Sequence, residues 1–140
     1  MRKKLLSVLF FTLVISIVYS CRNADQLKQD IYYTNGRDLY IKHCQNCHGT
    51  DGEGLNALAP ALTDTIFLKE NKKRIACYIK HGLDEKITIN GKVYDEKMPS
   101  FPNLANIDIA QITVYITNAF GNRQGHYTSE EVALDLKNCR

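Results

Sequence analysis

The chain has 140 residues and a formal net charge of +3. This length suits one domain once a leader is removed, and such a domain buries roughly two-thirds of the surface that its unfolded chain exposes. Three basic residues at the N-terminus account for the excess charge, leaving fifteen basic and fifteen acidic residues from Cys21 onward. A near-neutral chain without a basic stripe gives no basis for a nucleic-acid partner.

Residues 1–20 have the form of a secretory signal peptide of the lipoprotein type. A basic segment at positions 2–4 precedes an apolar run over positions 5–18, as in such leaders. This run is short for a membrane span, which needs about 20 apolar residues. Ser20 and Cys21 resemble the end of a bacterial lipobox, which predicts cleavage before Cys21 and lipidation of that cysteine. An uncleaved signal anchor is the alternative, and both interpretations predict an exported protein tethered to the periplasmic side of a membrane.

Residues 21–34 are mostly polar, and we interpret them as a tether to a domain that spans residues 35–140. A short helix is expected to begin at Asn35 and Gly36. Asp38 in its first turn is favourable there, because the N-terminal end of a helix dipole is positive.

The pattern Cys44-Gln45-Asn46-Cys47-His48 is the spacing that attaches a c-type haem. Two thiols on one helical turn can form thioethers with the haem, and the imidazole that follows can bind the iron as an axial ligand. Two other interpretations have less support. A dithiol redox motif needs a strand and helix context, which does not precede Cys44. A structural zinc site is poorly served by adjacent Cys47 and His48, and no second Cys-x-x-Cys or His pair follows.

The residues after this motif resemble those of bacterial class I cytochromes c, over about residues 35–121. The resemblance implies an all-α cytochrome c fold wrapped round one covalently attached haem c. It also implies that the first helix of the domain crosses the last core helix where Gly36 and Tyr40 meet Ile112 and Tyr115. The segments that carry the likeness are His48-Gly49-Thr50-Asp51-Gly52-Glu53-Gly54, Ala59-Pro60-Ala61-Leu62 and Lys97-Met98-Pro99-Ser100-Phe101.

The same resemblance assigns roles to two residues far from the motif. It makes the Pro60 carbonyl the acceptor for the second ring nitrogen of His48, a contact that orients an iron-bound imidazole. It makes Met98 the distal ligand, whose thioether sulfur favours ferrous iron. Three histidines compete for the distal position: His43, His81 and His126. We interpret His43 and His81 as surface residues.

Periodicity predicts the remaining elements of the domain. Apolar residues at helical spacing predict amphipathic helices over residues 67–82 and 107–120. Alternation around Asn90-Gly91 predicts a small type I′ β-hairpin over residues 87–94, just before the distal Met loop. Residues 128–131 form a capping-box pattern that opens an extra C-terminal helix.

Cys77 and Cys139 remain after the lipidation and haem-attachment cysteines are assigned. In an oxidising compartment, a remaining pair of this kind is expected to form a disulfide. Two buried free thiols are the alternative, because a sequence does not fix the geometry that a disulfide needs.

These features predict a membrane-tethered monohaem cytochrome that passes single electrons between redox proteins in a periplasmic or membrane-associated electron-transport chain. No catalytic constellation is visible in the sequence, so an electron-transfer protein is expected rather than an enzyme. Two alternatives stay open. The chain could be the electron-transfer subunit of a larger oxidoreductase complex, or an open-site haem sensor or peroxidase-like protein. Met98 argues against the last of these, since it would close the iron site.

Overall fold

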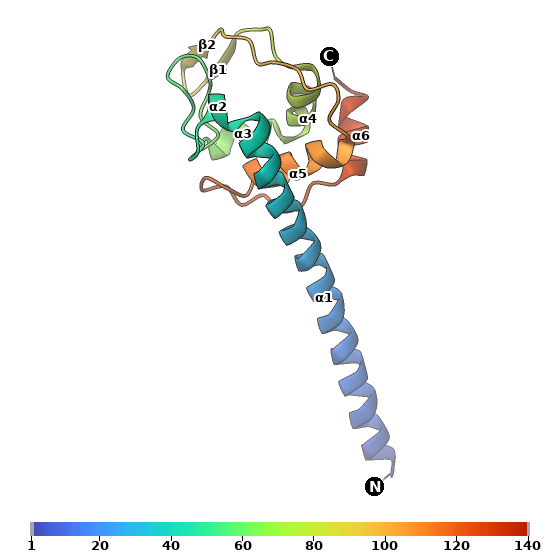
Figure 1. The fold of residues 1–140 in the computed structure, drawn as a ribbon. Helices are drawn as coiled ribbons and strands as arrows, with labels where there is room; N and C mark the ends of the chain where they lie inside the picture. Colours follow the sequence, from blue (N-terminus) through green and yellow to red (C-terminus); the bar gives the residue numbers. More distant parts are fainter. Residues whose placement is uncertain (1, 140) are drawn as a thin grey trace. The chain divides into compact units, whose positions relative to one another are not determined.

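The computed structural model describes residues 2–139, without the side chains of residues 2, 5 and 18–23. The fold is mainly helical and contains one two-stranded antiparallel sheet (Figure 1), which confirms the predicted all-α class with a small hairpin. The chain divides into two compact units, Met1–Ile31 and Tyr32–Arg140. The elements in chain order are α1 (Arg2–His43), α2 (Gln45–His48), α3 (Thr65–Glu70), α4 (Lys72–His81), β1 (Ile87–Ile89), β2 (Lys92–Tyr94), α5 (Asn106–Ile116) and α6 (Ser129–Leu136).

The first unit is the part of α1 that precedes Tyr32. Large apolar side chains of this segment, such as Phe10 and Ile17, are exposed. In the part of the chain that the structure describes, no helix has a stretch long and apolar enough to cross a membrane. Cys21, the predicted lipidation site, lies outside the residues whose side chains are described.

The expected helix start at Asn35 is wrong, because α1 already includes the polar segment that we interpreted as a tether. Residues 24–34 contain no glycine or proline that would interrupt the backbone hydrogen bonds of a helix. They include good helix formers such as Leu27, Lys28 and Gln29. The polar composition of residues 24–34 was therefore not evidence that a helix ends there.

In the second unit, the end of α1 crosses α5 at very short range, as the resemblance implied. Gly36 is buried, and a Cβ atom built on it would overlap the Gln111 carbonyl oxygen and lie 2.9 Å from the Tyr115 Cβ. The rings of Tyr40 and Tyr115 pack with their centroids 5.2 Å apart, and Phe120 packs against both. The missing side chain of Gly36 is what allows the two backbones to approach.

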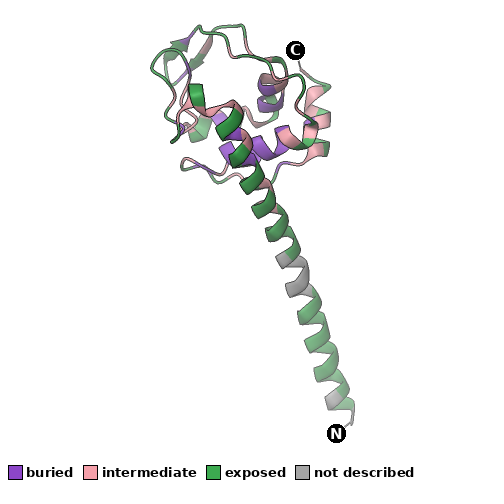
Figure 2. Ribbon diagram, in the orientation of Figure 1, coloured by how far each residue is buried: buried purple, intermediate pink, exposed green. Residues whose placement is uncertain are grey.

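The core of this unit is built on α5, which is buried over most of its length (Figure 2). Both α4 and α6 pack against α5 and against each other. Val132 is the fully buried anchor of α6. A disulfide joins Cys77 in α4 to Cys139 beyond the end of α6. The C-terminal helix is therefore an integral part of the core.

The single helix predicted over residues 67–82 is wrong, because the chain forms α3 and α4 with a break at Asn71. Asn71 has φ −103° and ψ 12°, outside helical geometry. Its side-chain Nδ2 donates to the Phe67 carbonyl at 3.0 Å, and its backbone N–H donates to the same oxygen at 3.0 Å. A short polar side chain that competes for backbone groups in this way favours a helix end over its continuation.

The helix predicted over residues 107–120 ends earlier, at Ile116. Asn118 causes a turn there, because its Nδ2 donates to the Val114 carbonyl while its Oδ1 accepts from the backbone N–H groups of Gln124 and Gly125. The chain after α5 therefore folds back on itself before α6 begins.

The two turn and capping predictions are confirmed. Asn90 and Gly91 both have positive φ, at 50° and 74°, as a type I′ hairpin requires. The strands pair in the register Ile87 with Tyr94. At α6, the Thr128 side chain accepts from the Glu131 N–H, and the Glu131 carboxylate accepts from the Thr128 N–H.

Replacing Gly36 with alanine tests the close crossing. Alanine favours a helix over glycine by about 1 kcal/mol, but overpacking against a fixed backbone costs about 1–3 kcal/mol. We expect Gly36→Ala to lower the free energy of unfolding, measured by denaturant titration. Asn35→Ala is the control, since Asn35 is exposed on the same helix and should be neutral or slightly stabilising. A Gly36→Ala protein as stable as the control would contradict the crossing.

Candidate functional site

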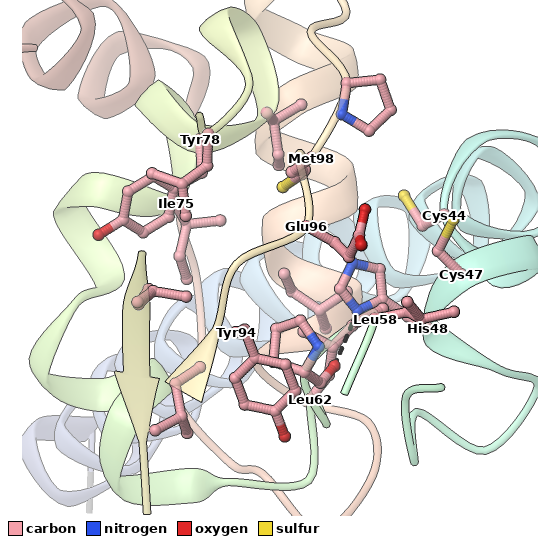
Figure 3. Close-up of a pocket in the computed structure, with 18 of the residues that line it drawn as sticks. Cys44, Cys47, His48, Leu58, Leu62, Ile75, Tyr78, Tyr94, Glu96 and Met98 are labelled. Atoms are coloured by element: carbon pink, nitrogen blue, oxygen red, sulfur yellow. Dashed lines mark hydrogen bonds between the residues drawn. The ribbon is translucent and has the colours of Figure 1, made fainter. Parts of the chain in front are cut away.

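An apolar cavity lies in the second unit, and its walls come from several separate segments (Figure 3). The space between these walls is about 930 Å³ with the open mouth and the solvent in it included. The predicted residues that line it together are Cys44, Cys47, His48, Pro60 and Met98. The structure thus brings all five into one site.

The end of α1 and the start of α2 place both thiols. The Cys44 N–H donates to the Tyr40 carbonyl at 2.8 Å, and the His48 N–H donates to the Cys44 carbonyl at 2.9 Å. Burial, and then the neighbouring Cys47, raise the pKa of the Cys44 thiol to about 12. A dithiol redox centre needs one thiol with a lowered pKa, and Cys44 is not such a thiol.

The His48 ring is oriented by one hydrogen bond. Its Nδ1 donates to the Pro60 carbonyl at 3.0 Å, the dashed line in Figure 3. With Nδ1 occupied as a donor, Nε2 is the nitrogen with a free lone pair. Burial lowers the pKa of the imidazole, and the hydrogen bond to Pro60 raises it by a smaller amount. The neutral ring, the form that binds metals, is therefore favoured.

Backbone hydrogen bonds within the loop before α3 bring the Pro60 carbonyl to His48. The Leu55 N–H donates to the Ala59 carbonyl at 3.0 Å, and the Leu62 N–H donates to the Gly52 carbonyl at 2.7 Å. These two contacts fold the loop back toward α2 on both sides of Pro60. The twelve-residue separation in sequence becomes direct contact in space.

Tyr40 has a second role that the sequence did not indicate. Its hydroxyl donates to the Gly49 carbonyl at 2.6 Å, just after His48. The sequence singled out this residue only for the helix crossing, yet it also fixes the end of the attachment motif. The side chain is almost fully buried, with 1% of the residue's surface exposed.

Met98 enters the same cavity from the segment after the hairpin (Figure 3). Its backbone forms a two-way bridge with Leu83: the Leu83 N–H donates to the Met98 carbonyl at 3.0 Å, and the Met98 N–H donates to the Leu83 carbonyl at 2.9 Å. Sequence reasoning missed this bridge, because no local pattern links two residues fifteen positions apart.

The other histidines do not line the cavity. The His43 ring packs against Phe101, with ring centroids 5.4 Å apart, and both His81 and His126 are exposed. Among the side chains that the structure describes, no three from His, Cys, Asp or Glu are grouped to hold a metal ion. This finding gives the zinc alternative no support.

Several apolar wall residues were not singled out from the sequence. Ile75 and Tyr78 come from α4, and Ile87, Ile89 and Tyr94 come from the hairpin. The signal was present in part, since Ile87 and Ile89 alternate with an exposed Thr88. The alternation in so short a strand indicates that Ile87 and Ile89 face inward. It does not indicate that they face a cavity rather than other side chains.

The donor set of this cavity fits a covalently attached haem. The two thiols could form thioethers, and imidazole and thioether groups, such as those of His48 and Met98, are among the side chains that haem iron accepts as ligands. The apolar walls suit the flat face of a porphyrin. Two charged residues, Glu96 and Lys97, also line the otherwise apolar site.

Comparisons with known proteins agree with this chemistry. A family model described as cytochrome c oxidase, cbb3-type, subunit III, matches residues 33–116. Two curated relatives, both named cytochrome c-552 and both from Thermus thermophilus, are each 28% identical over 107 residues. These alignments cover 70% of this chain and 81% and 72% of the relatives. The chain therefore belongs to the cytochrome c oxidase, cbb3-type, subunit III family, and it is a c-type cytochrome with covalently attached haem that transfers electrons.

Proposed function

We propose that this protein is a monohaem carrier of single electrons between redox proteins on the periplasmic side of a membrane. Cys44 and Cys47 hold the haem as thioethers, and His48 and Met98 bind its iron. One observation supports this proposal above all: these four side chains line a single apolar cavity. A carrier needs no further catalytic group, because its task is to gain and lose an electron without rearrangement.

Bound haem supplies an iron that takes up or gives up one electron, and the chain controls how easily that happens. His48 is held in one orientation by Pro60, which raises the basicity of the ligand. Met98 offers a soft sulfur that stabilises the reduced state. The apolar walls exclude water, so little solvent has to reorganise when the charge changes.

A second candidate function is that of an electron-transfer subunit in a larger oxidoreductase complex. The description of the matching family names an oxidase subunit, whereas the curated relatives carry the name of a single cytochrome. Purification from a mild detergent extract separates the two roles. A carrier elutes alone, whereas a subunit elutes together with larger redox proteins.

The tether is also part of the proposal. Residues 1–20 act as a signal peptide, residues 21–34 connect to the domain at 35–140, and Cys21 receives lipid. The basic and apolar composition of the leader supports this interpretation. Mass spectrometry of the mature N-terminal peptide tests it: an intact Met1 favours a signal anchor, and a cut elsewhere that yields a soluble protein argues against tethering.

Replacing both attachment cysteines tests the covalent link. Cys44→Ser with Cys47→Ser should abolish the haem stain on a denaturing gel, because serine has no sulfur with which to form a thioether. The control is Cys77→Ala with Cys139→Ala, which also removes two thiols but lies outside the cavity. The control should keep its stain. Equal staining of both variants would contradict attachment at Cys44 and Cys47.

Replacing Met98 tests the distal ligand. Wild-type ferric protein should show a weak far-red sulfur-to-iron absorption, and ferrous protein should bind carbon monoxide slowly. Met98→Leu should lose the absorption, bind carbon monoxide faster and have a lower reduction potential, since the thioether favours ferrous iron. Because the volume is conserved, the change in packing should cost less than about 1.5 kcal/mol, and any larger loss of stability would come from the lost bond to iron.

Met98→His is the matched comparison, since it keeps two axial ligands on the iron. It should bind carbon monoxide slowly yet still have a lowered potential. If wild-type protein lacked the far-red absorption and bound carbon monoxide quickly, the carrier proposal would lose its support and an open-site sensor would be favoured.

A further inference from the structure

The segment that carries Met98 is fastened to the C-terminal end of α4. Besides the two-way bridge between Leu83 and Met98, the Phe101 N–H donates to the Ile79 carbonyl at 3.0 Å. The segment is therefore held at two points on its backbone: Phe101 bonds to Ile79 in the last turn of α4, and Met98 bonds to Leu83 just after that helix.

Gly82 permits this approach. A Cβ atom at this position would lie 2.5 Å from the Met98 carbonyl oxygen and 2.9 Å from the Ser100 nitrogen, and its φ is +75°. Only glycine allows both this close approach and this positive φ without strain. The end of α4 is thus shaped to receive the Met98 segment.

Lys80 adds a third fastening further along the segment. Its Nζ donates to the Pro102 carbonyl and to the Leu104 carbonyl, each at 2.8 Å. Hydrogen bonds from a charged donor are stronger than those between neutral groups. Within the described residues Lys80 makes no ion pair, so these two carbonyls are the partners of its ammonium group. The side chain spans from the last turn of α4 to the chain just before α5.

We propose that Lys80 is a positioning residue for Met98. By tying Pro102 and Leu104 to α4, it keeps the segment between the bridge and α5 from lifting away, and so keeps the Met98 sulfur at the cavity. This inference rests on the proposed function, in which Met98 binds the haem iron. Lys80 itself does not line the cavity, so it acts only through Met98.

The same helix offers a matched control in Lys72. Its Nζ also donates to two backbone carbonyls, those of Gln124 at 3.0 Å and His126 at 3.1 Å. Both lysines are half-buried. Lys72 holds the chain between α5 and α6 and also lies over the Tyr127 ring, 5.9 Å from its centroid, whereas Lys80 holds the chain after Met98. Replacing either lysine would show a general loss of stability. Only replacing Lys80 should release Met98 from the iron.

The experiment compares Lys80→Met and Lys72→Met in haem-loaded full-length protein. Heating is followed in parallel by the far-red sulfur-to-iron absorption and by far-ultraviolet circular dichroism. In Lys80→Met the absorption should disappear at a lower temperature than the helical signal. Carbon monoxide should bind the ferrous form about tenfold faster, because a tenfold larger fraction of molecules has Met98 released from the iron. This factor corresponds to about 1.4 kcal/mol in the equilibrium between bound and released Met98. In Lys72→Met the two signals should disappear together, and carbon monoxide binding should match wild type.

Lys80→Arg should restore the wild-type behaviour, because the guanidinium keeps the charge and can donate to both carbonyls. If Lys80→Met does not accumulate as folded protein, Lys80→Gln replaces it, since an amide retains two donor hydrogens and should show a smaller shift in the same direction. Coincident loss of both signals in the Lys80 variants, with unchanged carbon monoxide binding, would overturn the positioning role.

The two proposals fail in different ways. If wild-type protein lacks the far-red absorption, Met98 is not an iron ligand, and both the carrier proposal and the role of Lys80 are wrong. If wild-type protein has the absorption while Lys80→Met behaves like Lys72→Met, only the role of Lys80 is wrong.

Discussion

The second unit is built around a space that its own side chains do not fill. Ile112 and Ile116 of α5 form part of the cavity wall, so the most buried helix of the protein faces the cofactor site rather than other helices alone. Haem therefore contributes apolar surface that would otherwise come from a larger core. Because the attachment is covalent, an unfolded chain keeps its cofactor close, and the apolar contacts can re-form without a search through solution.

The two proposed iron ligands are held by different kinds of structure. His48 lies one position beyond Cys47, so it is placed by the attachment motif itself, with Pro60 and Tyr40 fixing its surroundings. Met98 lies fifty positions away in the sequence. Its placement depends on tertiary contacts with α4, so sequence changes elsewhere can alter the position of the proposed distal ligand.

This difference explains which features could be predicted from the sequence. The attachment motif, the Asn90-Gly91 turn and the Thr128 capping box depend on neighbours within a few residues, and their local chemistry fixes their geometry. The break at Asn71 was missed because an apolar periodicity continued through it, while a single side-chain hydrogen bond decided the backbone. The Leu83–Met98 bridge and the contacts of Lys80 are long-range. No periodicity encodes which of many lysines will meet two particular carbonyls.

The position of α4 imposes an order on local unfolding. Cys77 ties this helix covalently to the C-terminal segment and thereby to the core, whereas the Met98 segment is held by hydrogen bonds to the end of α4 and by apolar contacts with the core, without a covalent link. We therefore expect the Met98 segment to open while α4 stays folded, whereas unfolding of α4 would release that segment. On this view the segment opens at a lower free energy than the unit formed by α4, α5 and α6.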